Sequence, residues 1–103
     1  MRLEIITAER KVYDDDVELV VVPGSDGELG ILSKHAPLMS TLQPGELLIR
    51  KEGEDTYLAV SGGFIEVLDD RSSFQKVVRI RIKPNLGALM YVFIVMGGQD
   101  GLD

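Results

Sequence analysis

The sequence has 103 residues, of which 45% are hydrophobic and 27% are charged, and this length and composition fit one folded domain and exclude a disordered chain. Its formal net charge of −6 argues against nucleic acid as a partner, because phosphate binding needs clustered lysine and arginine. The absence of cysteine excludes disulfides and thiolate metal sites and is consistent with a reducing compartment.

The charge is unevenly distributed along the chain. Residues 1–70 carry a net charge of −9, whereas residues 71–103 carry +3. The start of the chain places Glu4 inside its first apolar stretch and lacks the long apolar core of a secretory signal, so we expect a cytosolic protein. The longest apolar run, Leu86–Met96, has about half of the roughly 20 residues that a membrane-spanning helix needs.

Short runs of β-branched and aromatic residues, separated by turn residues, dominate the first two-thirds of the chain. The turn signals are roughly 8–12 residues apart, which is typical of a sandwich or barrel, and no window keeps a helical spacing of apolar residues. The sequence therefore predicts an all-β fold, a small β-sandwich or flattened barrel of short antiparallel strands, over residues 1–70. The expected strands are 2–6, 17–22, 46–50, 56–60 and 64–67.

The remainder, residues 71–103, is predicted to be an atypical tail with one or two strands or partial disorder. Residues 76–83 alternate strongly, with Val78, Ile80 and Ile82 on one face and basic residues on the other. That pattern predicts a strand. Residues 86–96 favour a second strand by composition, and the glycine-rich residues 97–101 indicate a frayed end.

His35 is the single histidine of the chain, so a histidine cluster for a metal ion is excluded. It lies beside Pro37 in a segment that favours a loop. A general base would need a serine or threonine nucleophile held against it, and the spacing identifies none. We expect a histidine hydrogen-bonded within a turn, and we predict no catalytic, cofactor or metal site.

Three consecutive acids, Asp14, Asp15 and Asp16, could suggest a hard cation such as Ca²⁺ or Mg²⁺. In extended backbone, however, their side chains point to alternating sides, and the spaced acids of a calcium loop are missing. The pattern favours a solvated loop before the next strand.

The glycines of residues 23–30 are not followed by Gly-Lys-Ser/Thr, so a phosphate-binding loop is not supported. We expect Gly24 and Gly27 to take positive φ in a turn, and Gly30 to permit a close approach of backbone. The segment 61–64, Ser-Gly-Gly-Phe, lacks the following helix of a nucleophile elbow and indicates a tight bend in a strand.

Five segments occur in order along the first two-thirds of the chain. They are Leu3-Glu4-Ile5-Ile6-Thr7, then Val21-Val22-Pro23-Gly24-Ser25-Asp26-Gly27-Glu28-Leu29-Gly30-Ile31-Leu32, then His35-Ala36-Pro37-Leu38, then Pro44-Gly45-Glu46, and Ala59-Val60-Ser61-Gly62-Gly63-Phe64-Ile65-Glu66-Val67. Over residues 1–68 the chain thereby resembles the N-terminal β-sandwich of the epsilon subunit of the rotary proton-translocating ATP synthase. One such segment would be weak evidence, but five in order are specific.

The resemblance implies a non-catalytic subunit at the foot of the central stalk that helps to couple proton flow to ATP synthesis. Its partners would be the gamma subunit on one side and the loops of the membrane c-ring on the other. It would associate peripherally with the cytoplasmic face of the plasma membrane, or with the equivalent organelle membrane. Glu28 lies in the turn that the family directs at the c-ring. The other implied partner-binding positions are Gly30, His35, Ala36, Pro37 and Leu38 in and beside the adjoining loop, and Ser61, Gly62 and Gly63 in the bend near it.

After Leu68 the sequence departs from the family. Members continue into a helical hairpin rich in alanine, glutamate and arginine, which restrains ATP hydrolysis and in some members binds ATP, and residues 71–103 lack that composition. Inhibition of ATP hydrolysis and ATP sensing are therefore not assigned to this chain. The tail is either a divergent ending whose strand 76–83 replaces the closing strand of the family, or an out-of-frame or truncated end. Sequencing the coding DNA across codons 66–78 distinguishes the two.

Two other interpretations stay open from the residues alone. One is a free-standing β-sandwich that binds proteins and has no membrane partner, which would fail to co-purify with the gamma subunit. The other is a small β-barrel enzyme that uses His35. A His35→Ala variant that leaves stalk assembly intact would count against the enzyme.

Overall fold

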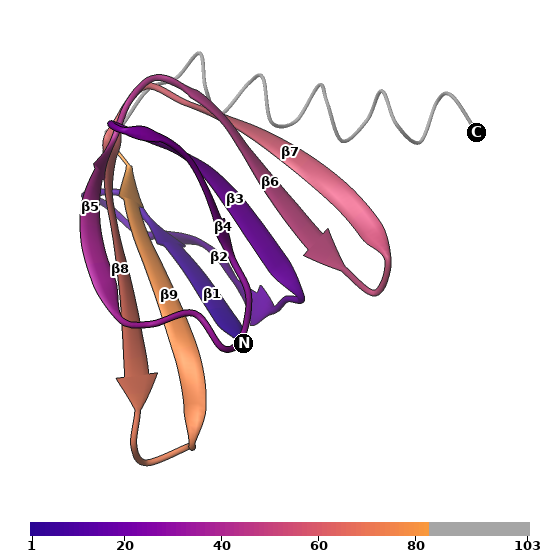
Figure 1. Cartoon of the computed structure of the whole chain (residues 1–103). Helices are drawn as coiled ribbons and strands as arrows, with labels where there is room; N and C mark the ends of the chain where they lie inside the picture. Colours follow the sequence, from indigo (N-terminus) through magenta and orange to yellow (C-terminus); the bar gives the residue numbers. More distant parts are fainter. Residues whose placement is uncertain (83–103) are drawn as a thin grey trace.

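The structure is a computed structural model that describes residues 1–82, and this part of the chain consists of β-strands joined by turns and loops (Figure 1). The predicted strand at 86–96 and the predicted frayed end at 97–101 lie outside the described residues. Among residues 1–82 there is no helix that could cross a membrane. The strands are β1 (Arg2–Ile6), β2 (Lys11–Asp16), β3 (Leu19–Gly24), β4 (Gly27–Ile31), β5 (Leu38–Leu42), β6 (Gly45–Lys51), β7 (Glu54–Val60), β8 (Gly63–Asp70) and β9 (Gln75–Ile82).

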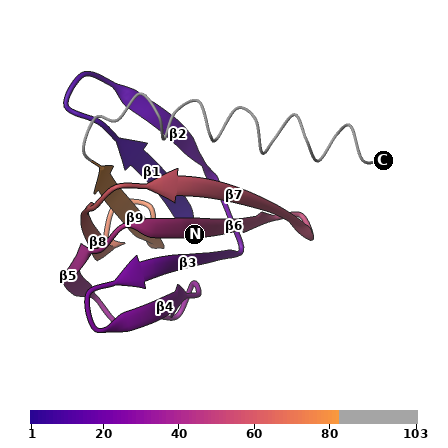
Figure 2. The ribbon, with the colours of Figure 1, turned by 90° about the horizontal axis from the view of Figure 1, so that it is seen from above.

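The strands form one curled sheet in the order β2-β1-β9-β8-β5-β3-β6-β7, with β4 paired to β3. Its strand pairs are antiparallel except that of β1 with β9, which is parallel. Between β5 and β3 the described residues share one backbone pair, Gly24 with Leu42, and there the sheet turns back over itself. Seen from above, the two halves face each other (Figure 2). The all-β sandwich, or flattened barrel, predicted from the sequence is thereby confirmed.

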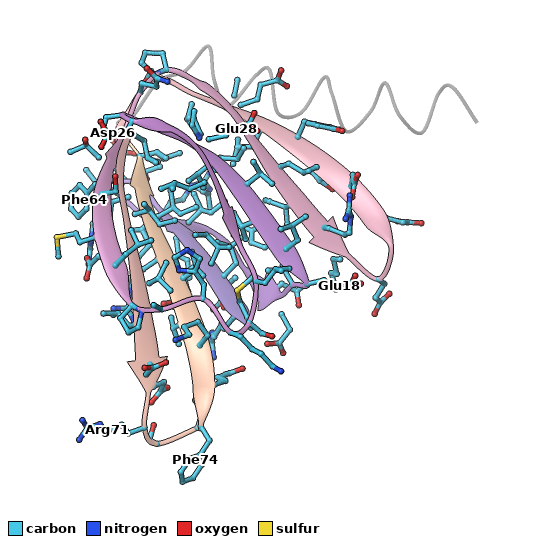
Figure 3. The ribbon with its side chains drawn as sticks, in the orientation of Figure 1. Glu18, Asp26, Glu28, Phe64, Arg71 and Phe74 are labelled. Atoms are coloured by element: carbon cyan, nitrogen blue, oxygen red, sulfur yellow. The ribbon has the colours of Figure 1, made fainter. Side chains whose placement is uncertain are left out.

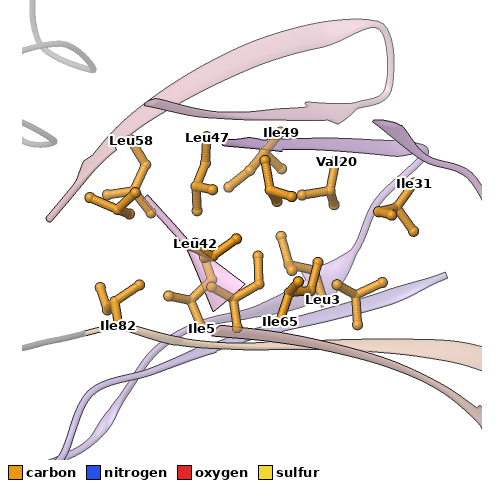
Figure 4. Close-up of a cluster of buried hydrophobic side chains, with 14 of the residues drawn as sticks. Leu3, Ile5, Val20, Ile31, Leu42, Leu47, Ile49, Leu58, Ile65 and Ile82 are labelled. Atoms are coloured by element: carbon orange, nitrogen blue, oxygen red, sulfur yellow. The ribbon is translucent and has the colours of Figure 1, made fainter. Parts of the chain in front are cut away.

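The core lies between the two halves of the sheet. Because side chains alternate along a strand, every second residue points inward while its neighbours face solvent (Figure 3). Val20, Leu47 and Ile49 from one half face Leu3, Ile5 and Ile65 from the other, and Leu42 lies between them (Figure 4). The inward-facing side chains that are fully buried are Leu3, Ile5, Val20, Val22, Ile31, Leu47, Ile49, Ile65, Val67, Val78 and Ile80.

Strand β9 lies between β1 and β8 and confirms the strand expected at 76–83, shifted by one residue. Its inward residues Val78, Ile80 and Ile82 belong to the core. Its basic residues meet acids from the first part of the chain. Arg79 donates to Glu4 at 2.9 Å, Arg81 lies 3.6 Å from Glu66, and Lys76 pairs with Asp69. Basic residues from the second part of the sequence therefore pair across strands with acidic residues from the first part.

Three strands were not predicted from the sequence. The expected solvated loop at Asp14–Asp16 is wrong, because these residues belong to β2 and pair with β1. Asp14 accepts from Arg2 at 2.8 Å and from Lys11 at 3.2 Å, and Asp15 pairs with Lys51 on the distant strand β6. Strands β4 and β5 were also not predicted. They form because β4 pairs with β3 and β5 pairs with β8, and local composition does not reveal such pairing.

The glycines of residues 23–30 confirm one of the three expectations made for them. Gly27 takes φ +126°, as predicted. The φ of Gly24 is not positive, so that expectation is wrong. Gly24 is instead the position where backbone approaches closely, because a Cβ there would lie 2.7 Å from the carbonyl oxygen of Gly27. The expectation for Gly30 is wrong, since a Cβ there would meet nothing within 4 Å.

The bend between β7 and β8 confirms the expected tight turn of backbone. Gly62 and Gly63 have φ of +132° and +141°, a region that side chains disfavour. A Cβ at Gly63 would lie 2.0 Å from the carbonyl oxygen of Arg81 on β9. Glycine at position 63 is therefore what lets β8 begin directly against the end of β9.

Glu4 is a charged residue on the outer face of β1 that is only 8% exposed. Lys11 donates to it at 2.5 Å and Arg79 at 2.9 Å. These hydrogen bonds lower the pKa of Glu4 below its ordinary value of 4.5, against the opposing effect of burial. The carboxylate thus joins β2 and β9 across β1.

Gly63→Ala is expected to lower the free energy of unfolding by about 2 kcal/mol or more, because it adds both a strained φ and a steric overlap with β9. Urea denaturation of the full chain measures the change. Gly30→Ala is the matched control, and its effect should stay within about 0.5 kcal/mol or be slightly stabilising. Equal effects of the two substitutions would contradict the close packing of the bend against β9.

Glu4→Gln is expected to lower the free energy of unfolding at pH 7 by about 1.5–3 kcal/mol, because it removes the negative charge and replaces one of the two acceptor oxygens with an NH2 donor that faces a cation. A carboxyl with a lowered pKa in the fold stabilises it above the unfolded pKa, and this contribution is lost as the pH falls through the folded value. The difference between wild type and variant should therefore narrow below about pH 4.5. Urea denaturation at pH 7 and pH 3.5 tests this, with exposed Glu9→Gln as the control. A difference independent of pH would refute the ionic role of Glu4.

Candidate protein-binding site

The positions implicated by the sequence lie at two opposite ends of the sandwich. One end, called the bend end, contains the β3–β4 turn and the Gly62–Gly63 bend, and the other, the hairpin end, contains the β4–β5 loop and the β8–β9 turn (Figure 1). The pairs Gly24 with Gly27, Gly24 with Leu42, and Leu42 with Gly63 place the turn and the bend at the same end. The structure therefore brings Glu28 and the glycine bend to one end of the sandwich and places the loop with His35 at the other.

Hydrogen bonds hold the β3–β4 turn against the end of β5. The backbone N–H of Ser25 donates to the carbonyl oxygen of Thr41 at 3.1 Å, and the two hydroxyl oxygens lie 2.7 Å apart. The N–H of Gln43 donates to the carbonyl oxygen of Pro23 at 2.9 Å. Since Thr41 pairs with Phe64 on β8, the turn has a fixed position relative to the glycine bend.

Glu28 is the second residue of β4, where it pairs with Pro23 and is exposed (Figure 3). Asp26, in the turn itself, is also exposed. Neither carboxylate forms an ion pair with any residue of the described part of the chain. Gly30 follows on the same strand, exposed and opposite Val21. The bend end thus presents two carboxylates whose charge is not neutralised within residues 1–82.

Ser61, Gly62 and Gly63 line an open groove of about 690 Å³ at the bend end, together with Ile6, Leu42 and Phe64 among others. Most of these lining side chains are apolar. The sequence identified the glycines and the adjoining Phe64 but missed Ile6 as their neighbour. Ile6 comes from β1, and its position follows from the parallel pairing of β1 with β9, for which the sequence gives no local signal.

His35, Ala36, Pro37 and Leu38 lie away from Glu28 and from the glycine bend. Strand β4 runs from the β3–β4 turn toward the hairpin end, and the loop that carries His35 follows it. Leu38 pairs with Val67, whereas Leu42, at the other end of β5, pairs with Gly63. Four residues of extended strand span about 13 Å. The expected nearness of these two groups is therefore not found.

His35 is held by local hydrogen bonds, as expected. Its N–H donates to the carbonyl oxygen of Leu32 at 2.9 Å, and its Nδ1 donates to the carbonyl oxygen of Ala36 at 2.7 Å. Within residues 1–82, this is the hydrogen bond that the imidazole makes, so no serine or threonine hydroxyl is held against it as a nucleophile would be. Over the same range, no three histidine or acidic side chains are grouped as metal ligands.

Sequence comparison relates residues 1–74 to the family described as ATP synthase, delta/epsilon chain, β-sandwich domain. The ATP synthase epsilon chain of Chloroflexus aggregans is 59% identical over 71 residues, covering 69% of this chain and 51% of that protein. The epsilon chain of Roseiflexus sp. is 54% identical over 71 residues with the same coverage. The chain therefore spans about half the length of the curated relatives it matches.

Solved structures with a similar fold come from mitochondrial ATP synthases. A chain in the cryo-EM structure of the Euglena gracilis enzyme, described as OSCP/F1/c-ring in rotational state 1, has a TM-score of 0.67 at 26% identity, covering 78% of this chain and 48% of that chain. A chain in the central stalk and c-ring of the Tetrahymena thermophila enzyme has a TM-score of 0.66 at 19% identity, covering 82% and 63%, and shows the fold alone.

The family match and the structure agree on the same segment of the chain. The match ends at Phe74, and residues 1–74 contain β1 to β8, the β3–β4 turn and the glycine bend. The five ordered segments of the sequence also lie within residues 1–74. By this match over most of its length, the chain belongs to the ATP synthase delta/epsilon family, and the part that matches is the β-sandwich domain of the epsilon chain.

Proposed function

We propose that this chain is a non-catalytic subunit of the central stalk of the proton-translocating ATP synthase. It binds the gamma subunit and the loops of the c-ring, and in doing so it helps to couple proton flow to ATP synthesis. The observation that carries this proposal is the family match over residues 1–74, supported by relatives that are named ATP synthase epsilon chain. The chain acts peripherally at the cytoplasmic face of the plasma membrane, or at the equivalent organelle membrane, through the complex.

The bend end is the surface proposed to face the c-ring. Asp26 and Glu28 are exposed there on a turn that hydrogen bonds fix to β5. Carboxylates that form no ion pair within residues 1–82 can pair with basic or polar loops, and such pairing sets orientation and association rate more than raw affinity. The neighbouring groove beside Ser61, Gly62 and Gly63 offers apolar surface for the same contact.

The hairpin end is the surface proposed to face the gamma subunit. The β4–β5 loop, with His35, Ala36 and Pro37, lies there, at the other end of the strands from Glu28. One flat partner cannot contact both ends of the sandwich, so two groups of binding residues fit two partners on opposite sides. A sandwich whose strands are joined into one sheet by backbone pairing can transmit force between them.

A non-catalytic role is supported by the surroundings of His35. Within residues 1–82 its imidazole is hydrogen-bonded to the carbonyl oxygen of Ala36, and no hydroxyl nucleophile is held against it. The proposal therefore assigns the chain a mechanical and structural part in the complex, and no substrate of its own.

Glu28→Lys is expected to weaken binding of the full chain to the detergent-solubilised c-ring by about tenfold, because it reverses a charge at the proposed contact. Binding is measured by surface plasmon resonance at low and high salt, and the defect should shrink as salt screens the charges. Glu54→Lys is the matched control, since it reverses the charge of an exposed residue near the β6–β7 turn, at the hairpin end. If both variants bind the c-ring as wild type does, the bend end is not the c-ring surface.

A further inference from the structure

The groove at the bend end, of about 690 Å³, is open and is lined mostly by apolar side chains. Its walls come from the end of β1 with Ile6, the end of β5 with Leu42 and the start of β8 with Phe64. Phe64 is 36% exposed although its side chain is large and hydrophobic. Apolar surface is unfavourable in water, and a contiguous apolar patch usually marks a contact. An apolar segment placed in this groove would therefore stabilise the fold.

Ile82, the last residue of β9, also lines this groove. The backbone pairs of β9 stop there. Ile82 is paired with Gly63, the first residue of β8, and Arg81 is paired with Ile6, the last residue of β1. Two positions further on, Pro84 has no N–H with which to continue a ladder. The part of the chain after Ile82 therefore starts at the groove, at a point where neither neighbouring strand of the described residues continues.

The sequence that follows Ile82 is strongly apolar. Residues 86–96 include no charged side chain and are rich in aliphatic, methionine and aromatic residues. Only residues 83–85 separate them from Ile82, and three residues span at most about 11 Å even when extended. So short a tether gives the apolar residues a high effective concentration at the groove, which favours this contact over one with a separate molecule. The groove and the apolar run are thus matched in chemistry and adjacent along the chain.

We propose that residues 86–96 fold back onto the sandwich and cover the groove at the bend end, with their apolar side chains against Ile6, Leu42 and Phe64. This inference goes beyond the proposed function and does not depend on it, because both sides of the contact belong to the chain itself. Asp26 and Glu28 do not line the groove, so covering it leaves these carboxylates available. The tail then removes apolar surface from water without blocking the charged contact proposed for the c-ring.

A single tryptophan can report on the groove, because the sequence contains none. Phe64→Trp places this probe in the groove, and Tyr57→Trp places it on β7 outside the lining, where the native side chain is similarly exposed, at 37% against 36%. In the full chain, Phe93→Asp combined with Ile94→Asp should uncover the groove, because burying two unpaired charges there is unfavourable. The fluorescence of the Phe64→Trp protein should then shift to longer wavelength and be quenched more strongly by acrylamide. The Tyr57→Trp protein should show neither change.

Unchanged fluorescence of the Phe64→Trp protein in the doubly substituted chain would overturn the proposal. Equal changes at both probe positions would also overturn it, because they would report a general loss of structure.

A second measurement needs no destabilising substitution. The photo-cross-linker p-benzoylphenylalanine, placed at position 64, should cross-link to residues 86–96 of the same chain, as located by mass spectrometry of the monomer. Placed at position 57, it should not. No cross-link to residues 86–96 from position 64, or cross-links between two chains alone, would refute the contact within the chain, and the second result would assign the groove to another copy. Neither measurement involves another subunit, so the proposed function can fail or stand independently of the result.

Discussion

The backbone pairing of β9 with β1 on one side and β8 on the other is the interaction on which the rest of the sandwich depends. Without it, both neighbours would expose a row of unpaired N–H and C=O groups, and β1 and β2 would lose their connection to the remaining sheet. Val78 and Ile80 would also leave the core. The position of this strand explains why Gly63 must be glycine, since the carbonyl of Arg81 occupies the space of a Cβ.

Residues 75–82, the described part of the tail, complete the sheet as the alternation of their sequence predicted. The family match stops at Phe74, yet the sheet continues to Ile82. The apolar residues of β9 face the core, and Lys76, Arg79 and Arg81 each meet an acid from β1 or β8. Such agreement between pattern, burial and charge is expected of a segment that fits its neighbours.

The sandwich presents surfaces at two opposite ends. Antiparallel strands return the chain repeatedly to the same two ends, so the turns gather into two separate surfaces. The bend end combines an apolar groove with two carboxylates that form no ion pair within residues 1–82, and the hairpin end carries the His35 loop and the β8–β9 turn. The strands between them are fixed by packing and ladder hydrogen bonds, so the distance between the two surfaces is fixed as well.

The sequence by itself determined the all-β class, the strand at 76–83 and the glycine bend, because alternation and turn glycines are local signals. The order of its five segments also determined the family. Tertiary structure alone decided that Asp14–Asp16 form a strand, because their pairing partners lie on β1 and β6. It likewise separated His35 from Glu28, since the direction of β4 depends on its pairing with β3. Contacts between residues far apart in sequence have no local signature, and these contacts decide which residues meet at each end of the sandwich.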